Sequence, residues 1–389
     1  MKVMPVTFDV GIVGAGIHGA AAAYHLSAKG LRTVLFERDA PAGGPTGESS
    51  AICRAYYTNP FLAGCARDSI EMLRGFEGIT GRDAEFRRTG LLFLHPPEDE
   101  ERVRESAGQL SDLGIPVEVL SREAVGERFP ALDLTGIGIA AWEPEAGYAD
   151  PVAATTGLVR AAAEGGAEVR TGEAVASLER ADRGGAIVET VGGDEVRCAR
   201  LLIAAGPWTR SLAAQLGVDL PLTVERHIVG AYRRVEGVDV PAHGDLLGGY
   251  YLRPEGDDLL LVGSLHAAPQ VDPDDYDRKA AREELERLAV PVIERVPGLE
   301  QASIHSGWAS LYDVSPDWQP VIGEVAPEVF VDAGTSGHGF KLAPALGRHV
   351  AGLVAGEEVD RGLAAFHPSR FAEGGAALVA GYGEARILG

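Results

Sequence analysis

The first 37 residues hold the feature that most constrains this chain. The apolar run FDVGIV (Phe8–Val13) leads directly into the sequence GAGIHG at positions 14–19, and an alanine-rich segment with helical spacing continues to Lys29. Gly30 then stops the helix, and RTVLFE (Arg32–Glu37) is a second apolar run. This order predicts a strand, a glycine turn, a helix and a parallel strand, which together form a right-handed β-α-β unit.

Each glycine of this turn has its own physical task. Gly14 permits the tight turn, Gly16 lets the backbone approach a pyrophosphate, and Gly19 lets the helix pack close to the strand. The free N–H groups of the helix N-terminus attract phosphate. Glu37 ends the second strand, where it is placed to accept hydrogen bonds from a ribose diol and to repel a 2′-phosphate. The segment predicts a dinucleotide site, and by itself it does not separate FAD from NAD.

Composition narrows the partners and the compartment. A chain of 389 residues fits two interleaved domains, and its formal net charge of −22 repels nucleic-acid phosphates and anionic lipid. Three cysteines (Cys53, Cys65 and Cys198) follow no metal-ligand spacing, so we expect no metal site and no disulfide framework. The N-terminus lacks the apolar core of a signal peptide, and no run approaches a membrane span. We therefore expect a cytoplasmic protein that binds neither nucleic acid nor membrane.

Further glycine turns follow apolar strands near residues 206 and 333, as a long, deeply buried cofactor requires. Segments 222–235 and 245–265 alternate with period two and predict antiparallel strands. We also expect one strand over Glu168–Leu178 and a helix over Tyr276–Val290.

Several quoted segments together resemble the D-amino acid oxidase superfamily of flavoproteins, nearest to its sarcosine oxidase, glycine oxidase and dimethylglycine dehydrogenase branch. The resemblance runs nearly end to end. Its segments are GIVGAGIHGAAAAYHLSAKGLRTVLFE (11–37), ESSAICRAYY (48–57), GYADP (147–151), LLIAAGPWT (201–209), VERHIVG (224–230), YYLRPEG (250–256), LYDVSPDWQPVIG (311–323) and VDAGTSGHGFKLAPALG (331–347). The last two, in this order and spacing, are the most specific.

The resemblance implies an α/β fold in which a Rossmann-type FAD-binding domain carries an inserted α+β substrate domain with an antiparallel sheet. We expect the FAD-binding domain to comprise residues 1–85, 142–220 and 321–389, and the substrate domain 86–141 and 221–320. It further implies oxidation of a small amine or amino acid, with N-methyl and D-amino acids as examples. The hydride passes to flavin N5, and the imine that forms is hydrolysed.

Four residues match substrate-site positions of the family. Lys341 and Arg54 match residues that bind the substrate carboxylate, which suits a bidentate guanidinium. Tyr251 matches a substrate-cavity tyrosine, and His266 resembles a histidine near the flavin. Each also has a structural interpretation: a solvated lysine, a structural ion pair, a buried strand aromatic and a core histidine. Arg253, on the same strand face as Tyr251, is a second carboxylate candidate.

The predicted FAD contacts come from four parts of the chain. The residues are Gly14, Gly16, Ile17, His18, Gly19, Glu37, Arg38, Ser49, Ser50, Ala205, Gly206, Trp208, Gly334, Gly337, His338, Gly339, Phe340 and Lys341. Backbone N–H groups of the last loop, with the dipole of the following helix, are suited to stabilise negative charge on the reduced flavin.

Departures from the family pattern carry predictions of their own. Relatives that attach FAD covalently do so through a cysteine, where this chain has Ser310, or through a histidine, of which residues 40–55 have none; we therefore expect non-covalent FAD. Sarcosine-type oxidases carry a lysine that promotes reaction with oxygen, and Leu261 or Val262 stands there, so we expect a dehydrogenase or a slow oxidase. Tyr312 replaces an arginine of glycine oxidases, which argues against glycine as substrate.

Two other functions remain open from the sequence. A 2-hydroxy acid dehydrogenase of the same superfamily needs a base for the hydroxyl proton, a role that would fall to His266. A flavin-carrying subunit would pass electrons to a partner subunit instead of oxygen.

Overall fold

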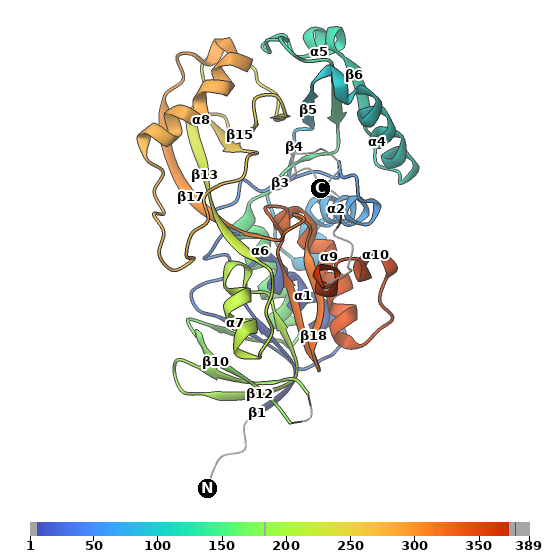
Figure 1. Ribbon diagram of the computed structural model, residues 1–389, viewed down its shortest axis with the longest axis vertical. Coiled ribbons are helices and arrows are strands. Elements are labelled where there is room, and N and C mark those ends of the chain that lie inside the picture. Colours follow the sequence, from blue (N-terminus) through green and yellow to red (C-terminus); the bar gives the residue numbers. More distant parts are fainter. Residues whose placement is uncertain (1–5, 183, 373–377, 379–389) are drawn as a thin grey trace.

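The computed structural model describes residues 6–182, 184–372 and 378, and Figure 1 shows two sheet-containing halves joined by a layer of helices. The first sheet has a parallel centre. Its parallel strands, in spatial order, are β9 (Glu168–Thr171), β2 (Thr33–Glu37), β1 (Val6–Val13), β12 (Glu195–Ile203) and β19 (Val329–Ala333). Antiparallel strands flank them: β18 (Val321–Ala326) pairs with β19, and the hairpin of β10 (Val175–Arg180) and β11 (Ala186–Thr190) pairs with the first half of β12.

The three apolar strands that precede glycine turns are neighbours in this sheet. Val13 pairs with Ile203, and Ile203 pairs with Val331, so β1, β12 and β19 end at the same edge. Because parallel strands present their carboxyl ends together, the turns that follow them meet at one place. The expectation of one nucleotide-binding sheet assembled from distant segments is confirmed.

Helices α1 (Ile17–Ala28), α2 (Pro60–Arg74), α6 (Pro151–Glu164) and α9 (Gly339–Ala355) cover one face of the first sheet. Small side chains set their spacing: Ala20–Ala23 of α1 are fully buried, and a Cβ on Gly347 of α9 would lie 2.6 Å from that of Ala21. The first and the last glycine turns are thus carried by helices in direct contact. The short helix α7 (Thr209–Gln215) packs on the opposite face.

The second sheet lies at the other end of the molecule (Figure 1). Its strands, in spatial order, are β17 (Ile304–Val314), β13 (Thr223–Arg233), β16 (Leu259–Ser264), β15 (Tyr250–Glu255), β14 (His243–Asp245), β5 (Leu91–His95), β7 (Ile139–Glu143) and β6 (Glu118–Ser121). All neighbours are antiparallel except β14 and β5. A third, three-stranded sheet joins β3 (Ile52–Cys53), β8 (Gly147–Tyr148) and β4 (Arg87–Arg88).

The remaining helices are α3 (Phe76–Thr80), α4 (Glu100–Asp112), α5 (Arg122–Arg128), α8 (Arg282–Arg295) and α10 (Arg361–Ala364). Helix α8 packs on the face of the second sheet that carries Leu260 and Val262. The opposite face, which carries Leu261, is the one turned toward the first sheet. None of the helices among the described residues is long and apolar enough to cross a membrane.

The α/β fold class with a largely antiparallel second sheet is confirmed, and two element assignments were wrong. Glu168–Leu178 is not one strand, because Gly172 at φ +71° turns the chain between β9 and β10. The helix expected over Tyr276–Val290 begins only at Arg282. The domain boundaries stay a prediction. The first sheet draws its strands from 6–37, 168–203 and 321–333 and the second from 91–143 and 223–314, while 1–5 and 379–389 lie outside the described residues.

Candidate functional site

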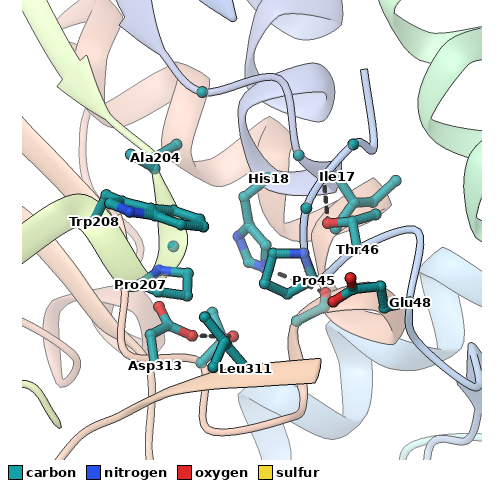
Figure 2. Close-up of a pocket in the computed structure, with 18 of the residues that line it drawn as sticks. Ile17, His18, Pro45, Thr46, Glu48, Ala204, Pro207, Trp208, Leu311 and Asp313 are labelled. Carbon is teal, nitrogen blue, oxygen red and sulfur yellow. Dashed lines mark hydrogen bonds between the residues drawn. The ribbon is translucent and has the colours of Figure 1, made fainter. Parts of the chain in front are cut away.

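A cavity of about 420 Å³ lies between the glycine turns of the first sheet and the inner face of the second. Figure 2 shows Trp208, Pro207 and Ala204 on one side of it, Thr46, Pro45 and Glu48 on the other, and His18 between them. Most of the predicted FAD contacts line it. They are Gly14, Gly16, Ile17, His18, Glu37, Arg38, Ser49, Ser50, Ala205, Gly206, Trp208, Gly337, Gly339 and Phe340.

The first glycine turn has the tight geometry that its sequence predicts. Gly14 has φ +102°, and a Cβ there would lie 2.6 Å from the carbonyl oxygen of Ala204. A Cβ on Gly19 would lie 1.9 Å from the carbonyl oxygen of Gly14, so Gly19 serves close packing behind the cavity, not its wall. The Ile17 N–H donates to Thr46 Oγ1 (3.2 Å), which ties this turn to the 41–50 loop (Figure 2).

Glu37 holds the edge of the cavity beside this turn. Its Oε2 accepts from the Ala15 N–H (2.8 Å) and its Oε1 from the Asp39 N–H (2.9 Å). Each oxygen keeps a second lone pair, so the carboxylate remains able to accept from a ribose diol. Next to it, the Arg38 guanidinium lies 3.8 Å from the centre of the Trp208 ring, a flat surface against which an aromatic base can pack.

The last glycine turn is fixed from below by a buried carboxylate. Asp313 accepts from the Gly334 N–H (2.7 Å) and from the Thr335 hydroxyl (3.1 Å). Gly337 has φ +83°, and a Cβ there would lie 2.4 Å from the Tyr312 ring. The turn can therefore carry only glycine where it meets the second sheet. Gly334 and His338 lie behind the cavity wall and not in it.

Buried polar atoms without partners test whether this cavity suits a polar cofactor. Among the described residues, Glu48 Oε2, Glu173 Oε2, His227 Nδ1 and Asp332 Oδ1 are buried with no hydrogen bond, and all four residues line the cavity. Unpaired buried polar atoms are costly, and a ligand rich in hydroxyl and N–H groups would satisfy them. With the glycine turns and the Arg38–Trp208 surface, these atoms fit FAD.

A second, smaller cavity of about 70 Å³ adjoins the first, and Ser49, Ser50, Tyr251, Tyr312, Gly337 and Phe340 line both. The structure brings Arg54, Lys341 and Tyr251, three of the four predicted substrate-site residues, together in its wall. Its other lining residues are Ile52, Leu91, Phe93, Gly244 and Leu265. Within the described residues no carboxylate lines this cavity, so its field is positive.

Lys341 and Arg54 influence each other there. Burial, followed by the nearby Arg54 guanidinium, lowers the pKa of Lys341 to about 7. Arg54 lies over the Tyr57 ring at 4.2 Å and donates to the Tyr56 carbonyl oxygen. An anion that bridged the two cations would restore the charged form of the lysine.

Glu143 supports the loop that carries Arg54. This buried carboxyl at the end of β7 accepts from the N–H groups of Ala55 (2.7 Å) and Tyr56 (3.0 Å), and burial raises its pKa to about 7 although those bonds and Arg54 oppose the rise.

Tyr251 lies between the two cavities. Burial raises its pKa, and hydrogen bonds with Ser50 and Tyr312 partly oppose this. Burial also raises the pKa of Tyr312, so both tyrosines line the two cavities with uncharged hydroxyl groups.

Three other candidates lie elsewhere than the sequence predicted. His266 is exposed beyond the end of β16, with its ring over Gly249, and lines neither cavity; the preceding Leu265 is the residue that lines the small one. Arg253 makes structural contacts: it donates to the Ser50 carbonyl oxygen (2.6 Å), forms an ion pair with Glu255 and stacks on the Tyr148 ring. His338 is buried behind the loop, where its Nδ1 lies 3.0 Å from the Tyr57 hydroxyl.

Sequence reasoning missed a histidine that does line the large cavity. His227 Nε2 lies 3.1 Å from Glu225, and its ring stacks on Tyr312 with 3.9 Å between centroids. The segment VERHIVG gave the only signal, since its alternation puts His227 on the same strand face as Val229. Thr46, Glu48, Glu143, Asp313 and Asp332 were also not singled out, although Glu48, Asp313 and Asp332 lie within the quoted segments 48–57, 311–323 and 331–347.

The structure decides between Leu261 and Val262. Leu261 packs with Val229, Ala231 and Trp308, on the face of the second sheet that meets the large cavity. Val262 belongs to the core on the opposite face. Leu261 is therefore the one of the two whose side chain lies on the cavity side of the second sheet. Ser310, on the neighbouring strand, lines the large cavity.

Fold and site together define a flavoprotein-type oxidoreductase with a Rossmann sheet, a roofing antiparallel sheet and a cationic cavity where they meet. The family comparison agrees. Residues 9–353 match the profile of DAO, the FAD dependent oxidoreductases, so the chain belongs to this family, which comprises FAD-dependent amine and amino acid oxidoreductases.

Individual relatives have low sequence identity to this chain, but the alignments cover most of it. The chain is 28% identical to monomeric sarcosine oxidase of Streptomyces avermitilis, over 95% of this chain and 99% of that protein. It is also 28% identical to 4-methylaminobutanoate oxidase (formaldehyde-forming) of Paenarthrobacter nicotinovorans, with 88% of this chain aligned, but it spans only 43% of that protein's length. Among solved structures, L-proline dehydrogenase from P. horikoshii has a TM-score of 0.85 at 25% identity, covering 96% of this chain and 100% of that one.

Proposed function

We propose that this protein oxidises a small secondary amino acid, such as an N-methyl amino acid or a cyclic one, with non-covalently bound FAD. The observation that carries the proposal is the small cavity: two cations and a set of apolar side chains, adjoining a cavity that fits FAD. Sarcosine and L-proline, which give two of the relatives their names, are both small secondary amino acids. When bound, FAD supplies the acceptor for the hydride removed from the α-carbon.

Arg54 and Lys341 carry the binding step. A guanidinium presents two parallel N–H donors to a carboxylate, and the ammonium of Lys341 adds a third charged donor. With the carboxylate held there, the α-carbon and the amine extend toward Tyr251 and Tyr312, which separate the small cavity from the large one. Fixing the substrate in one orientation is itself a large part of catalysis.

The small cavity also selects the protonation state of the amine. Two cations and no carboxylate among its described lining residues disfavour a protonated ammonium group. The neutral amine, whose lone pair assists departure of the α-hydrogen, is therefore the form that binds productively. Leu91, Phe93 and Leu265 provide apolar surface for an N-methyl group or a ring.

Oxidation of a hydroxy acid is less well supported. That reaction needs a base for the hydroxyl proton, and the histidine expected to serve, His266, lies outside both cavities. Electron transfer to an acceptor other than oxygen is favoured by Leu261, an apolar side chain that packs with Val229, Ala231 and Trp308. This leaves room for a redox partner or a partner subunit as acceptor.

One set of experiments tests the proposal. The purified full-length chain should show the visible absorption of flavin, and acid precipitation should release all of it into the supernatant. Anaerobic addition of sarcosine or proline should bleach the visible band, and lactate should leave it unchanged. A colourless protein that stays colourless with added FAD would falsify the cofactor assignment; yellow protein after acid precipitation would overturn non-covalent binding only. Bleaching by lactate and not by amines would overturn the substrate class.

A further inference from the structure

His18 joins the two glycine turns that come from opposite ends of the chain. It lies in the first turn of α1, and its Nδ1 is 2.9 Å from Asp332 Oδ2 at the end of β19. Its Nε2 is 3.2 Å from the Gly339 carbonyl oxygen at the start of α9. The ring thus lies between two atoms, one from each structural element that flanks the last glycine turn.

Neither of these neighbours can donate a hydrogen bond. A carboxylate that is ionised and a backbone carbonyl are acceptors only, so both ring nitrogens must carry hydrogen for both bonds to exist. His18 therefore makes both bonds only as an imidazolium. A cation in the first turn of a helix opposes the helix dipole, and the Asp332 carboxylate compensates this charge.

The His18–Asp332 pair faces the large cavity. His18 and Asp332 both line the large cavity together with Gly14 and Gly16, the glycines suited to hold a pyrophosphate. Asp332 Oδ1 is buried without a hydrogen-bond partner among the described residues, so the pair also offers a ligand one unused acceptor. Among the described residues, Asp313 on β17 is a second carboxylate that acts on His18, and it accepts hydrogen bonds from Gly334 and Thr335.

We infer that His18 links the two glycine turns in its protonated form, and that FAD binding favours this form and is therefore coupled to proton uptake at His18. The inference rests on the proposed cofactor. Burial opposes the charge on His18, but the nearby Asp332 and Asp313 carboxylates and the two hydrogen bonds together raise its pKa above the ordinary value. The diphosphate of FAD, if held by the same helix terminus, would raise the pKa of His18 further.

The sign follows from linkage. A group whose pKa rises on binding strengthens binding at low pH, and this gain is lost as pH rises through the bound-state value. FAD affinity should therefore be highest near pH 6 and fall toward pH 9, by about tenfold for each pKa unit that the bound anion adds. Once the ring is neutral, either Asp332 or Gly339 loses its donor and the two turns separate more easily.

The same helix supplies a matched control. His25 of α1 also links to α9, through Nε2 and the Pro344 carbonyl oxygen at 3.0 Å, but within the described part of the chain it has no carboxylate partner, and it lines neither cavity. Burial lowers its pKa. His25→Gln should therefore leave the pH dependence of FAD binding unchanged, whereas His18→Gln should remove it. His227→Gln tests the other cavity histidine in the same way.

The experiment is titration of full-length apoprotein with FAD, followed by quenching of flavin fluorescence between pH 6 and 9. We expect the wild-type dissociation constant to rise about tenfold over this range, and that of His18→Gln to stay flat and meet the wild type near pH 9. Asp332→Asn should shift the wild-type curve to lower pH. Calorimetry in two buffers of different ionisation enthalpy should show proton uptake by the wild type.

Each outcome decides one question. A flat wild-type curve without proton uptake, or a His18→Gln curve that follows the wild type, overturns the inference while FAD binding stands. Absence of FAD binding at every pH overturns the proposed cofactor instead. Thermal unfolding checks that each variant is folded; if His18→Gln is not, the wild-type curve, the proton uptake and Asp332→Asn still decide.

Discussion

The two cavities that meet at Tyr251 and Tyr312 are built in opposite ways. One side of the large one is formed by glycine turns that follow the strands of a parallel sheet, and each turn is a local motif. The small one is lined mostly by side chains, which come from strands β3, β5, β15 and β17, from residues beside β3 and β16 and from the start of α9. Its walls bring together segments that are far apart in the sequence, such as Ser49–Ser50, Tyr251 and Phe340–Lys341.

This difference explains what each cavity can vary. The geometry of the glycine turns depends on absent side chains, so nearly any substitution there displaces backbone. The small cavity depends on which side chains long-range packing brings together, so single substitutions can alter its charge without moving the turns. We expect the first cavity to fix the cofactor and the second to set the substrate. The predictions below test this division, beginning with the largest expected effect.

Alanine at Gly19 should abolish FAD binding. The new Cβ would lie 1.9 Å from the Gly14 carbonyl oxygen, a backbone atom, so helix α1 must shift away from the turn. Overpacking of this kind costs about 1–3 kcal/mol or more in stability, and we expect FAD affinity to fall more than about 100-fold. Gly30→Ala is the control: Gly30 has φ +75° but nothing within 4 Å of a Cβ, so it should lose stability only. Fluorescence titration with FAD compares the two.

Removal of the two cations should affect substrate and spare the cofactor. A charge-assisted hydrogen bond contributes about 1.5–3 kcal/mol, so Arg54→Met and Lys341→Met should each weaken sarcosine binding about 10- to 100-fold. FAD affinity should stay within about twofold, because neither side chain lines the large cavity. The half-saturation concentration for anaerobic flavin reduction measures the first effect. Unchanged half-saturation in the double variant would refute the carboxylate site.

The pKa of Lys341 predicts how carboxylate binding depends on pH. With a ligand-free pKa of about 7, Lys341 loses its charge above pH 7, whereas a bound carboxylate favours the charged form. Affinity for acetate should be constant below pH 7 and fall up to tenfold per pH unit above it. Glu143, whose pKa is also raised to about 7, adds a smaller fall in the same direction when it ionises. Acetate titrations of the flavin spectrum should show a shallower slope in Lys341→Met.

A cation at position 261 should accelerate reaction with oxygen. Leu261 lies in an apolar cluster on the cavity side of the second sheet, and a lysine there would favour formation of superoxide electrostatically. We expect Leu261→Lys to increase reoxidation of the reduced protein by air about tenfold, equivalent to ~1.4 kcal/mol of barrier. Leu261→Met, similar in volume and uncharged, is the control. Stopped-flow measurement of the visible band checks this, and rapid wild-type reoxidation would contradict the dehydrogenase assignment.

The contrast also shows which features a sequence can predict. The strand–turn–helix order around Gly14 is local, so the first β-α-β unit and the predicted role of its glycines followed from spacing, whereas the predicted contacts of the last glycine turn were given with the family resemblance. The small cavity needed more: Arg54 and Lys341 were found through the family resemblance, and Glu143, which positions Arg54, lies 88 residues from Ala55 in the sequence. Nothing in the run LLLV at 259–262 chooses between Leu261 and Val262, because both are apolar and the choice depends on how β16 pairs with its neighbours.

The same dependence on strand register explains the error at His266, and the smallest predicted effect follows from it. Tyr251 pairs with Gly263, and β16 ends one residue later, so His266 leaves the sheet and stays exposed over Gly249. An exposed side chain without a partner in either cavity contributes within about 0.5 kcal/mol. His266→Ala should therefore change FAD affinity and anaerobic reduction by less than about twofold. A loss of tenfold or more in reduction would mean that the loop after β16 folds over the small cavity when substrate binds, and the cavity's walls would then include a residue that closes on the substrate.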